Sequence, residues 1–481
     1  MNIKKAAIII ASVCALFLIC ATSAKLAAQT SAPPPNLADA LARPIVTVVD
    51  KTDMPAGVSK HDYVSYARYY WPDPSKPDGL PYISRDGDHN KEQVARGDHA
   101  RLWTFFNTVE TLTNAWRANH DAAAATRAGE WIRAWLVSPA TRMNPNFDYA
   151  QIRLGHDNNR GTASGIIDAR GFGGIVAAIN DLDGSPALAA FEKESLHSWF
   201  TTYIEWLMTS KNGMAERAAQ NNHGTWFIAQ TLPIAIYVGR DYLAQALSEE
   251  AKKRIGVQIM RDGSQPQEIR RVDGLGYSVF NLEAYAEIAK AAAPLGVDIW
   301  NYVSPGHASL GRAVDFLAPY NTDPSKWPNS QKAQLQPGFL DALIKARDAA
   351  AKNPVQPASA HPTPPAPPPS PPPSAPVTVP APVAPAPQEP PTSYPATAPA
   401  ATNQTALNSV NIVLQKDGAI LINGKKVAIK QLSDMLSVLQ TINGDFPVLI
   451  KMEPNAPLQT LASVMEACRN AGFNKVTVQT Q

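Results

Sequence analysis

The residues LWTFFNTVETL at positions 102–112 place apolar side chains three and four positions apart. These apolar positions are Leu102, Phe105, Phe106, Val109 and Leu112. They would share one face of an α-helix, because the helix turns once every 3.6 residues. The same spacing recurs, between short Gly, Pro or Asn turns, in segments at about 195–209, 225–238, 241–259, 277–293 and 308–317. We therefore expect a mainly α fold, built as a helical array or toroid.

The chain as a whole exceeds what one hydrophobic core usually organises, since it has 481 residues. Of its 43 Pro residues, 20 fall in a segment at about 351–405 that contains PPAPPPSPPPSAP. This segment has few backbone donors and little apolar surface, so it is predicted to be a disordered, polyproline-like linker. The linker would separate a helical domain at 45–350 from a second globular domain at 408–481.

The second domain has the pattern of a small α/β fold. Strands are expected in NIVLQKDG (411–418) and AILINGKKV (419–427), in which Asn423-Gly424 marks a turn. Leu432, Met435, Leu436 and Leu439 mark a helix. A strand at 448–452, a helix at 458–471 and a strand at 475–478 would complete a ββαβαβ order.

Residues 1–28 have the order of a secretory signal peptide. Lys4 and Lys5 precede an apolar run at 6–21, and small residues follow. An uncleaved membrane anchor is the alternative reading of this run. In both cases the rest of the protein would be exported, to the periplasm or beyond the cell.

Cysteine usage and charge exclude several classes of protein. Cys468 is the only cysteine outside the signal peptide, which excludes an internal disulfide and a thiolate metal cage. Its place in an apolar helical pattern predicts a buried thiol. The formal net charge of +2 argues against a nucleic-acid partner.

The densest polar cluster is NNHGTW at 221–226, at the start of an apolar helical segment. Amide and imidazole groups beside the positive end of a helix favour an anion. Taken alone, such a pair would also fit a helix cap and a core histidine.

A second polar cluster, QPQEIRR at 265–271, is followed by Tyr277. A loop that enters a helix here would bring an arginine and the phenol within one or two turns of each other. A cationic neighbour favours the phenolate form of tyrosine. Taken alone, this cluster would also fit a surface ion pair and a core tyrosine.

Together the two clusters meet the needs of β-elimination from a uronate. The C5 proton is very weakly acidic until the charge of the carboxylate is neutralised, a role suited to Asn222, His223 and an arginine. A base must then take the proton, and an acid must protonate the departing glycosidic oxygen. Tyr277 can do both where the two atoms lie on one face of the sugar; otherwise His223 would be the base on the opposite face. No metal or other cofactor is required.

Several motifs, in this order, resemble the alginate lyase superfamily domain over about residues 45–335. They are KHDY at 60–63, YYWPDP at 69–74, DGLPYISRDG at 78–87, GIIDAR at 165–170, NNHGTW at 221–226 and the segment 265–282. The resemblance implies an incomplete (α/α) toroid with a central cleft. The catalytic groups that it implies are Asn222, His223, Arg271 and Tyr277, and the residues expected to contact substrate are Trp71, Tyr82, Arg85, Asn221, Trp226 and Arg270.

Three details of this resemblance bear on the site. Counting from Glu268 selects Arg271 as the catalytic arginine, whereas a spacing counted back from the tyrosine selects Arg270; we favour Arg271. The segment 71–90 resembles a mobile lid over the cleft, although its Gly and Pro residues equally suit a static loop. Position 227 is Phe where relatives often carry Tyr, which leaves the substrate subclass open.

The C-terminal domain resembles the periplasmic domain of ExbD/TolR proteins. The resemblance rests on QKDG at 415–418, ING at 422–424, PVLIK at 447–451 and AGF at 471–473. Those proteins carry a membrane helix directly before this domain, where the present chain has the proline segment, so proton-motive coupling is not supported. The domain could instead dock to an envelope protein or to the cell wall. Alternatively, it could be a stability module that has no partner.

The combined prediction is an exported polysaccharide lyase that cleaves an anionic polymer such as alginate, polymannuronate or a glucuronan. A protein that binds an anionic glycan without cutting it, tethered in the cell envelope, is the second hypothesis, and a hydrolase is the third. A lyase creates a conjugated unsaturated uronate and so raises ultraviolet absorbance. A hydrolase would release reducing ends without that signal.

Overall fold

The computed structural model describes residues 34–356 and, in the C-terminal part, 410–422, 425–429, 432–433, 436, 448–454, 456–473 and 476–480. The predicted signal peptide and nearly all of the predicted proline-rich linker lie outside these residues. The chain divides into two compact units, a helical unit and a C-terminal unit, which are described separately.

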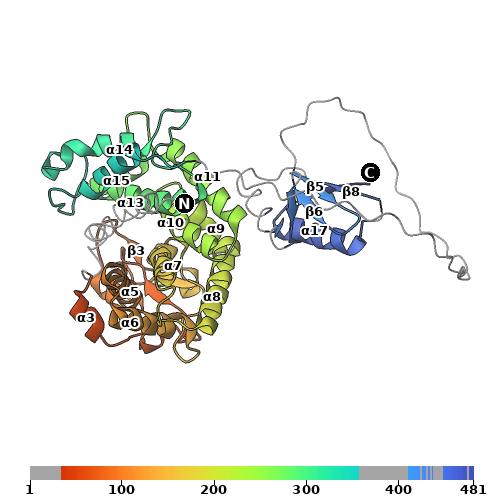
Figure 1. Ribbon diagram of the computed structural model, residues 1–481. Coiled ribbons are helices and arrows are strands. Elements are labelled where there is room, and N and C mark those ends of the chain that lie inside the picture. The colour runs from red at the N-terminus through yellow and green to blue at the C-terminus, as the bar shows by residue number, and fades with distance from the viewer. Residues whose placement is uncertain are drawn as a thin grey trace, which may run out of the picture. The chain divides into compact units, whose positions relative to one another are not determined.

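The helical unit consists of helices that follow one another along the chain (Figure 1). The longer helices are α5 (His99–Asn119), α6 (Ala122–Ile132), α7 (Phe172–Asp181), α8 (Ala190–Thr209), α10 (Asn222–Tyr237), α11 (Asp241–Gln258) and α13 (Gly274–Ala292). The shorter ones are α3 (Leu37–Ala42), α4 (Lys91–Ala95), α9 (Lys211–Ala218), α12 (Pro266–Ile269), α14 (Leu310–Leu317) and α15 (Asp341–Lys352). The helix predicted from apolar spacing at 102–112 is confirmed as part of α5. The five further segments are confirmed as α8, α10, α11, α13 and α14, of which three begin three to five residues earlier than predicted.

Short turns reverse the chain between neighbouring helices. His120 ends α5 in the left-handed conformation, with φ of 51°. The side chain of Asp121 then accepts a hydrogen bond from the backbone N–H of Ala124 at 3.0 Å and so caps the start of α6. Because one turn connects them, α5 and α6 pack side by side.

The helices curl into an open arc, in which α10 is a central element. It packs against α7, α11 and α13, while α5 packs against α6 and α7 (Figure 1). Buried aromatic rings fill the space around α7. Phe172 contacts a set of rings comprising Phe106, Phe147, Trp199, Phe200 and Tyr203.

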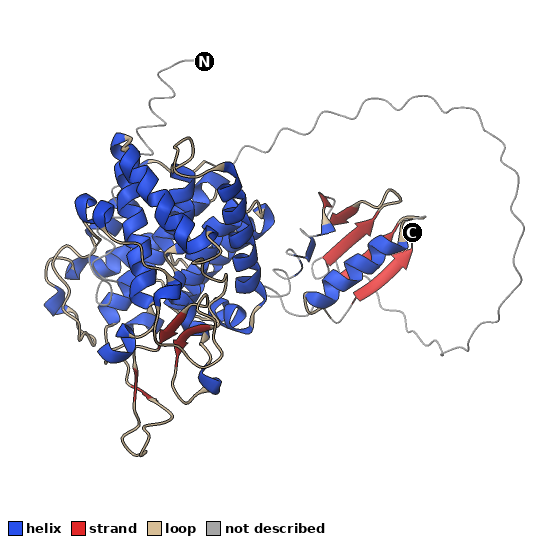
Figure 2. Ribbon diagram, turned by 90° about the horizontal axis from the view of Figure 1, so that it is seen from below, coloured by secondary structure: helices blue, strands red, loops and turns tan. Residues whose placement is uncertain are grey.

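Short strands accompany the helices. Strand β1 (Val64–Tyr66) pairs in parallel with β4 (Tyr149–Ile152), and β2 (Tyr70–Trp71) pairs antiparallel with β3 (Ile83–Ser84). The β2–β3 hairpin projects from the helical body (Figure 2), and its β3 strand is exposed. This hairpin and the chain that follows it form the segment predicted as a lid, residues 71–90.

The C-terminal unit contains a five-stranded sheet with the strand order β7-β6-β5-β8-β9. Its elements are β5 (Val410–Leu414), β6 (Ile420–Ile422), β7 (Lys425–Val427), β8 (Val448–Met452), α17 (Leu458–Asn470) and β9 (Val476–Thr480). The segment 419–427, predicted as one strand, forms two antiparallel strands that flank positions 423–424, as an Asn-Gly pair favours a hairpin. Cys468, which belongs to α17, is buried, as predicted.

The remaining predictions for residues 408–481 divide into those within and those outside the described residues. Leu432 and Leu436 of the predicted first helix are buried, whereas Met435, Leu439 and the Asn423-Gly424 turn lie outside the described residues. Within the parts of the chain that the structure describes, no helix is long and apolar enough to cross a membrane.

Candidate active site

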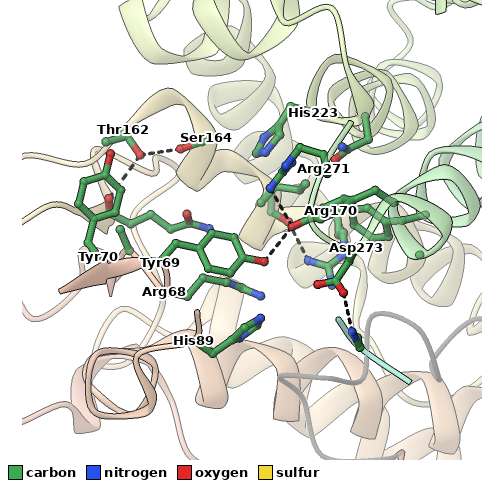
Figure 3. Close-up of a pocket in the computed structure, with 18 of the residues that line it drawn as sticks. Arg68, Tyr69, Tyr70, His89, Thr162, Ser164, Arg170, His223, Arg271 and Asp273 are labelled. Carbon is green, nitrogen blue, oxygen red and sulfur yellow. Dashed lines mark hydrogen bonds between the residues drawn. The ribbon is translucent and has the colours of Figure 1, made fainter. Parts of the chain in front are cut away.

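A cavity of about 260 Å³ lies inside the helical unit (Figure 3). Its walls come from the chain around β2, from the loop after β4, from the 3-10 helix at Ala163–Ala169, from the first turns of α10 and α13, and from residues 331–335. The four predicted catalytic residues, Asn222, His223, Arg271 and Tyr277, all line this cavity. The tertiary structure thus brings together two polar clusters that lie about fifty residues apart in the sequence.

Asn222, at the start of α10, is held by Glu268 of the short helix α12. The backbone N–H and the Nδ2 atom of Asn222 each donate to the Glu268 carboxylate, both at 2.7 Å. Since a carboxylate oxygen only accepts, this pairing fixes which way the amide points. The Oδ1 atom of Asn222 is buried and has no hydrogen-bond partner among the described residues. Because Oδ1 can only accept, the group that could serve a carboxylate is the second hydrogen of Nδ2, which the bond to Glu268 does not use.

His223 is held from behind by Glu216 of α9. Its Nδ1 lies 2.7 Å from Glu216 Oε1, and the imidazole is 23% exposed whereas the carboxylate is 3% exposed. Burial of the imidazole lowers its pKa, but the charge and hydrogen bond of Glu216 outweigh burial, so the pKa of His223 is raised. Because Nδ1 faces Glu216, Nε2 is the ring nitrogen left for a ligand.

Tyr277, in the first turn of α13, lies between Arg271 and Tyr69. Arg271 Nη2 donates to Tyr277 Oη at 3.0 Å, and the hydroxyls of Tyr69 and Tyr277 are 2.8 Å apart (Figure 3). Arg271 does lower the pKa of Tyr277, as expected of a cationic neighbour, but its effect is not the largest one here. Burial, together with Tyr69, raises the pKa of Tyr277 and outweighs the opposing effect of Arg271, which favours the neutral phenol.

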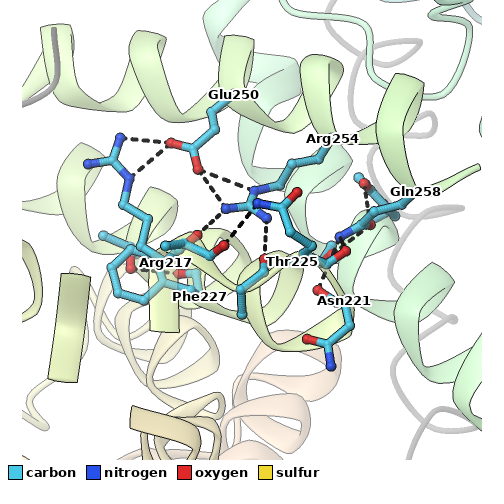
Figure 4. Close-up of polar contacts among 12 residues, drawn as sticks. Arg217, Asn221, Thr225, Phe227, Glu250, Arg254 and Gln258 are labelled. Carbon is cyan, nitrogen blue, oxygen red and sulfur yellow. Dashed lines mark hydrogen bonds and ion pairs between the residues drawn. The ribbon is translucent and has the colours of Figure 1, made fainter. Parts of the chain in front are cut away.

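The turn before α10 is held by a buried polar network (Figure 4). Glu250 accepts hydrogen bonds from Arg217 at 2.7 Å and from Arg254 at 2.9 Å. Arg254 also donates to the carbonyl of Ala219 at 2.7 Å, and Gln258 donates to the carbonyl of Asn221 at 3.0 Å. These donors satisfy carbonyls that the turn would otherwise bury unpaired, and so they fix the position at which Asn222 and His223 enter the cavity.

The residues predicted to contact substrate do not line the cavity in this structure; they are Trp71, Tyr82, Arg85, Asn221, Trp226 and Arg270. Asn221 caps α10, Trp226 packs on Phe280 with 4.9 Å between ring centroids, and Arg270 is hydrogen-bonded to Gln267. The spacing that selected Arg271 rather than Arg270 therefore agrees with which side chain reaches the cavity.

The other three, Trp71, Tyr82 and Arg85, belong to the 71–90 segment, whose C-terminal end is bound to the α12–α13 region. Asp86 accepts from Arg271 at 2.7 and 3.0 Å, and Asp88 pairs with Lys332 at 2.6 Å. Gly87 has φ of 72° and packs directly against Val272, so a side chain at this position would clash. The C-terminal end of the segment is thus held beside Arg271, which lines the cavity, by ion pairs with Arg271 and Lys332.

Sequence reasoning missed much of the cavity wall. The cavity residues that it did not select include Arg68, Tyr69, Tyr70, His89, Gln151, Arg153 and Arg170. Several stand in quoted motifs, because Tyr69 and Tyr70 begin YYWPDP and Arg170 ends GIIDAR. Nothing in the spacing of those motifs distinguishes residues that face the cavity from residues that support it.

Asp168 of GIIDAR supports the cavity from behind. It is fully buried and accepts hydrogen bonds from Tyr63 at 3.0 Å, from Ser65 at 2.7 Å and from Gln151 at 2.9 Å. It also lies 3.6 Å from Arg68 Nη2. This carboxylate therefore ties β1, β4 and the start of the cavity wall together.

The cavity is suited to an anionic ligand. Four of its described lining residues are arginines, and one is an aspartate, Asp273. The Asp273 carboxylate is engaged by the backbone N–H groups of Lys332 at 2.9 Å and Ala333 at 2.6 Å. Among the residues that the structure describes, no group of three or more His, Cys, Asp or Glu side chains is placed to hold a metal ion.

The arc of helices, the cavity with its arginines and the partly buried phenol beside Arg271 fit a polysaccharide lyase, and the comparisons with known proteins place the chain in that class. Residues 47–327 match the family model described as alginate lyase. The chain belongs to the alginate lyase family. It is 34% identical to a crystal structure of an alginate lyase from Bacteroides ovatus, with a TM-score of 0.63, over 70% of this chain and 87% of that one.

More distant structures are also similar. A variant of alginate lyase A1-III in complex with a tetrasaccharide is 16% identical, with a TM-score of 0.39, over 50% of this chain and 68% of that one. An apo form of the same lyase variant is 16% identical, with a TM-score of 0.43, over 68% of this chain and 84% of that one. No curated protein matches the chain. Residues 375–481 match the family model for biopolymer transport protein ExbD/TolR.

Proposed function

We propose that this lyase cleaves a uronate polymer by β-elimination, with Asn222, His223 and Arg271 at the carboxylate and Tyr277 at the transferred proton. The observation that carries the proposal is that all four side chains line one cationic cavity. A uronate carboxylate offers the two acceptor oxygens that a guanidinium binds best. Asp86 is bound to Arg271 in just this way, and a substrate carboxylate would replace it.

Neutralising the carboxylate makes the C5 proton removable. The raised pKa of His223 favours the imidazolium, whose Nε2–H can donate to the substrate carboxylate while Nδ1–H donates to Glu216. The developing negative charge is spread onto a carboxylate already bound by donors, which lowers the barrier to forming it.

Tyr277 then moves the proton. A neutral phenol has a proton to give and lone pairs to accept one, so Tyr277 can take the C5 proton while its own proton passes to the departing glycosidic oxygen. The C4–O bond breaks as the C4–C5 double bond forms, and Tyr277 ends in the form in which it began. This requires the C5 proton and the glycosidic oxygen on one face of the sugar, as in mannuronate and glucuronate but not in guluronate.

Ultraviolet absorbance with the purified protein tests this proposal. Absorbance should rise with polymannuronate or glucuronan, because the product is a conjugated unsaturated uronate. Tyr277→Phe should lose about 10²- to 10⁴-fold in kcat while still binding the polymer, and Tyr242→Phe, a tyrosine on α11 that does not line the cavity, should retain activity. Activity on polyguluronate alone, or an active Tyr277→Phe variant, would overturn the assignment.

We further propose that the chain is organised as an exported lyase domain at 45–350, a linker, and an envelope-docking domain at 408–481. The ExbD/TolR match of the C-terminal residues and the export pattern of residues 1–28 support this arrangement. The docking domain would hold the lyase near the cell surface, bound to an envelope protein or to the cell wall. Cell fractionation tests it: the full chain should remain with the envelope, and a chain that ends at residue 350 should be released in soluble form.

A further inference from the structure

The cavity extends well beyond the residues that act on one sugar. In Figure 3, Tyr70 lies beside Thr162 and Ser164 on one side, Arg271 and Asp273 lie on the other, and Tyr69 lies between them. A polymer threaded through this cavity would place the sugar next to the cleaved one at the Tyr70 end. The proposed mechanism uses none of the groups found there.

Arg153 is the cation at that end of the cavity. It follows β4, lines the cavity, and stacks its guanidinium over the Tyr70 ring at 5.7 Å from the centroid. Its contact with the Tyr70 hydroxyl is long, at 3.4 Å, and its Nε is buried without a hydrogen-bond partner among the described residues. A buried donor without a partner costs free energy until a ligand satisfies it.

The remaining partner of Arg153 is easily exchanged. Asp157 accepts from Nη2 at 2.7 Å, but Arg153 is 33% exposed and Asp157 is 61% exposed. Ion pairs with this exposure contribute little to stability. A ligand carboxylate could therefore take the place of Asp157 at small cost.

The loop that carries Arg153 has an unusual backbone. Three consecutive residues other than glycine, Asp157, Asn158 and Asn159, have φ between 48° and 55°. Such left-handed residues persist when surrounding contacts enforce them, and they concentrate at binding and catalytic sites. Here the enforcing contacts include the hydrogen bond that the Gly155 N–H donates to Asn159 Oδ1 at 2.9 Å and the one between His156 Nε2 and the Tyr82 carbonyl at 2.7 Å.

We propose that Arg153, stacked on Tyr70, binds the carboxylate of the sugar next to the one that is cleaved, so that the enzyme selects substrates with two consecutive uronates. This inference rests on the proposed β-elimination from a uronate polymer. It adds a second carboxylate site at the opposite end of the cavity from Arg271. Arg153 is a specificity residue and takes no part in moving the proton.

Arg153→Gln tests the proposal on polymannuronate. The variant loses the charged hydrogen bond between Arg153 and the substrate carboxylate, so its kcat/KM should fall about ten- to hundredfold, mainly because KM rises. Arg153→Lys, which keeps the charge but not the forked geometry, should fall less. Arg160→Gln is the matched control, because Arg160 lies on the same loop, pairs with Asp148 at 3.6 Å and does not line the cavity; it should retain activity.

A second measurement separates binding from damage to the fold. Polymannuronate in which a random fraction of the carboxyl groups has been reduced to alcohols contains fewer pairs of adjacent uronates. The wild-type rate should fall with the square of the uronate fraction, whereas the rate of Arg153→Gln should fall in simple proportion. A proportional fall for the wild type, or unchanged kcat/KM in Arg153→Gln, would overturn the inference while leaving the lyase proposal intact. A wild-type protein inactive on every polyuronate would overturn both.

Discussion

Replacing Glu216 by glutamine tests the charge state in which His223 works. The Glu216 side chain is almost fully buried and accepts from His223 Nδ1 at 2.7 Å. Glutamine keeps the size but removes the charge that raises the pKa of His223, while the burial that lowers this pKa remains. A hydrogen bond to a charged group contributes about 1.5–3 kcal/mol, so the imidazolium should be about ten- to hundredfold less stable in the variant.

The assay is the pH dependence of kcat/KM on polymannuronate, followed by ultraviolet absorbance. A raised pKa means that the imidazolium is present below that pKa and is lost as the pH rises through it. The alkaline limb of the profile should therefore move to lower pH in Glu216→Gln. The loss relative to wild type should grow with pH until it reaches about ten- to hundredfold, and it should be small in acid.

Glu192→Gln provides the control for removing a buried carboxylate. Glu192 is 3% exposed, pairs with Arg133 and does not line the cavity, so this change should leave both limbs in place. If the acidic limb of Glu216→Gln moves instead of the alkaline one, His223 acts as a neutral base and the reasoning is wrong. An unmoved profile would show that the titration of His223 does not control the reaction.

Three further changes test other parts of the site. Tyr69→Phe removes the 2.8 Å contact that orients Tyr277, so kcat should fall about tenfold with little change in KM; unchanged kcat would contradict this positioning role. Asp86→Asn removes the charge of Asp86 from its ion pair with Arg271, so KM should fall by less than about fivefold. A higher KM would show that Asp86 instead positions Arg271 for the substrate. Asp168→Ala removes the carboxylate that pairs with Arg68 and accepts hydrogen bonds from the Tyr63 and Ser65 hydroxyls. The free energy of unfolding, measured by denaturant titration, should fall by about 3–5 kcal/mol. A fall of less than about 1 kcal/mol would contradict the structural role of Asp168.

The sequence by itself determined the helices and the identity of the catalytic candidates. Apolar spacing predicts α8, α10, α11, α13 and α14, because a helix that buries one face must repeat its apolar positions every 3.6 residues. The spacing of apolar residues likewise predicts strand β8 and helix α17 of the C-terminal unit. The chemistry of a carboxylate and a transferred proton likewise selects Asn222, His223 and Tyr277, since these side-chain groups are visible in the sequence.

Only the tertiary structure decided which side chains face the cavity and which protonation states the environment favours for them. Arg271 reaches the cavity and Arg270 does not, although they are adjacent, because successive residues of a helix or turn point in different directions. The pKa of Tyr277 depends on burial and on Tyr69, which lies more than two hundred residues earlier in the chain. Such contacts and burial arise only when distant segments pack together, so no local pattern in the sequence encodes them.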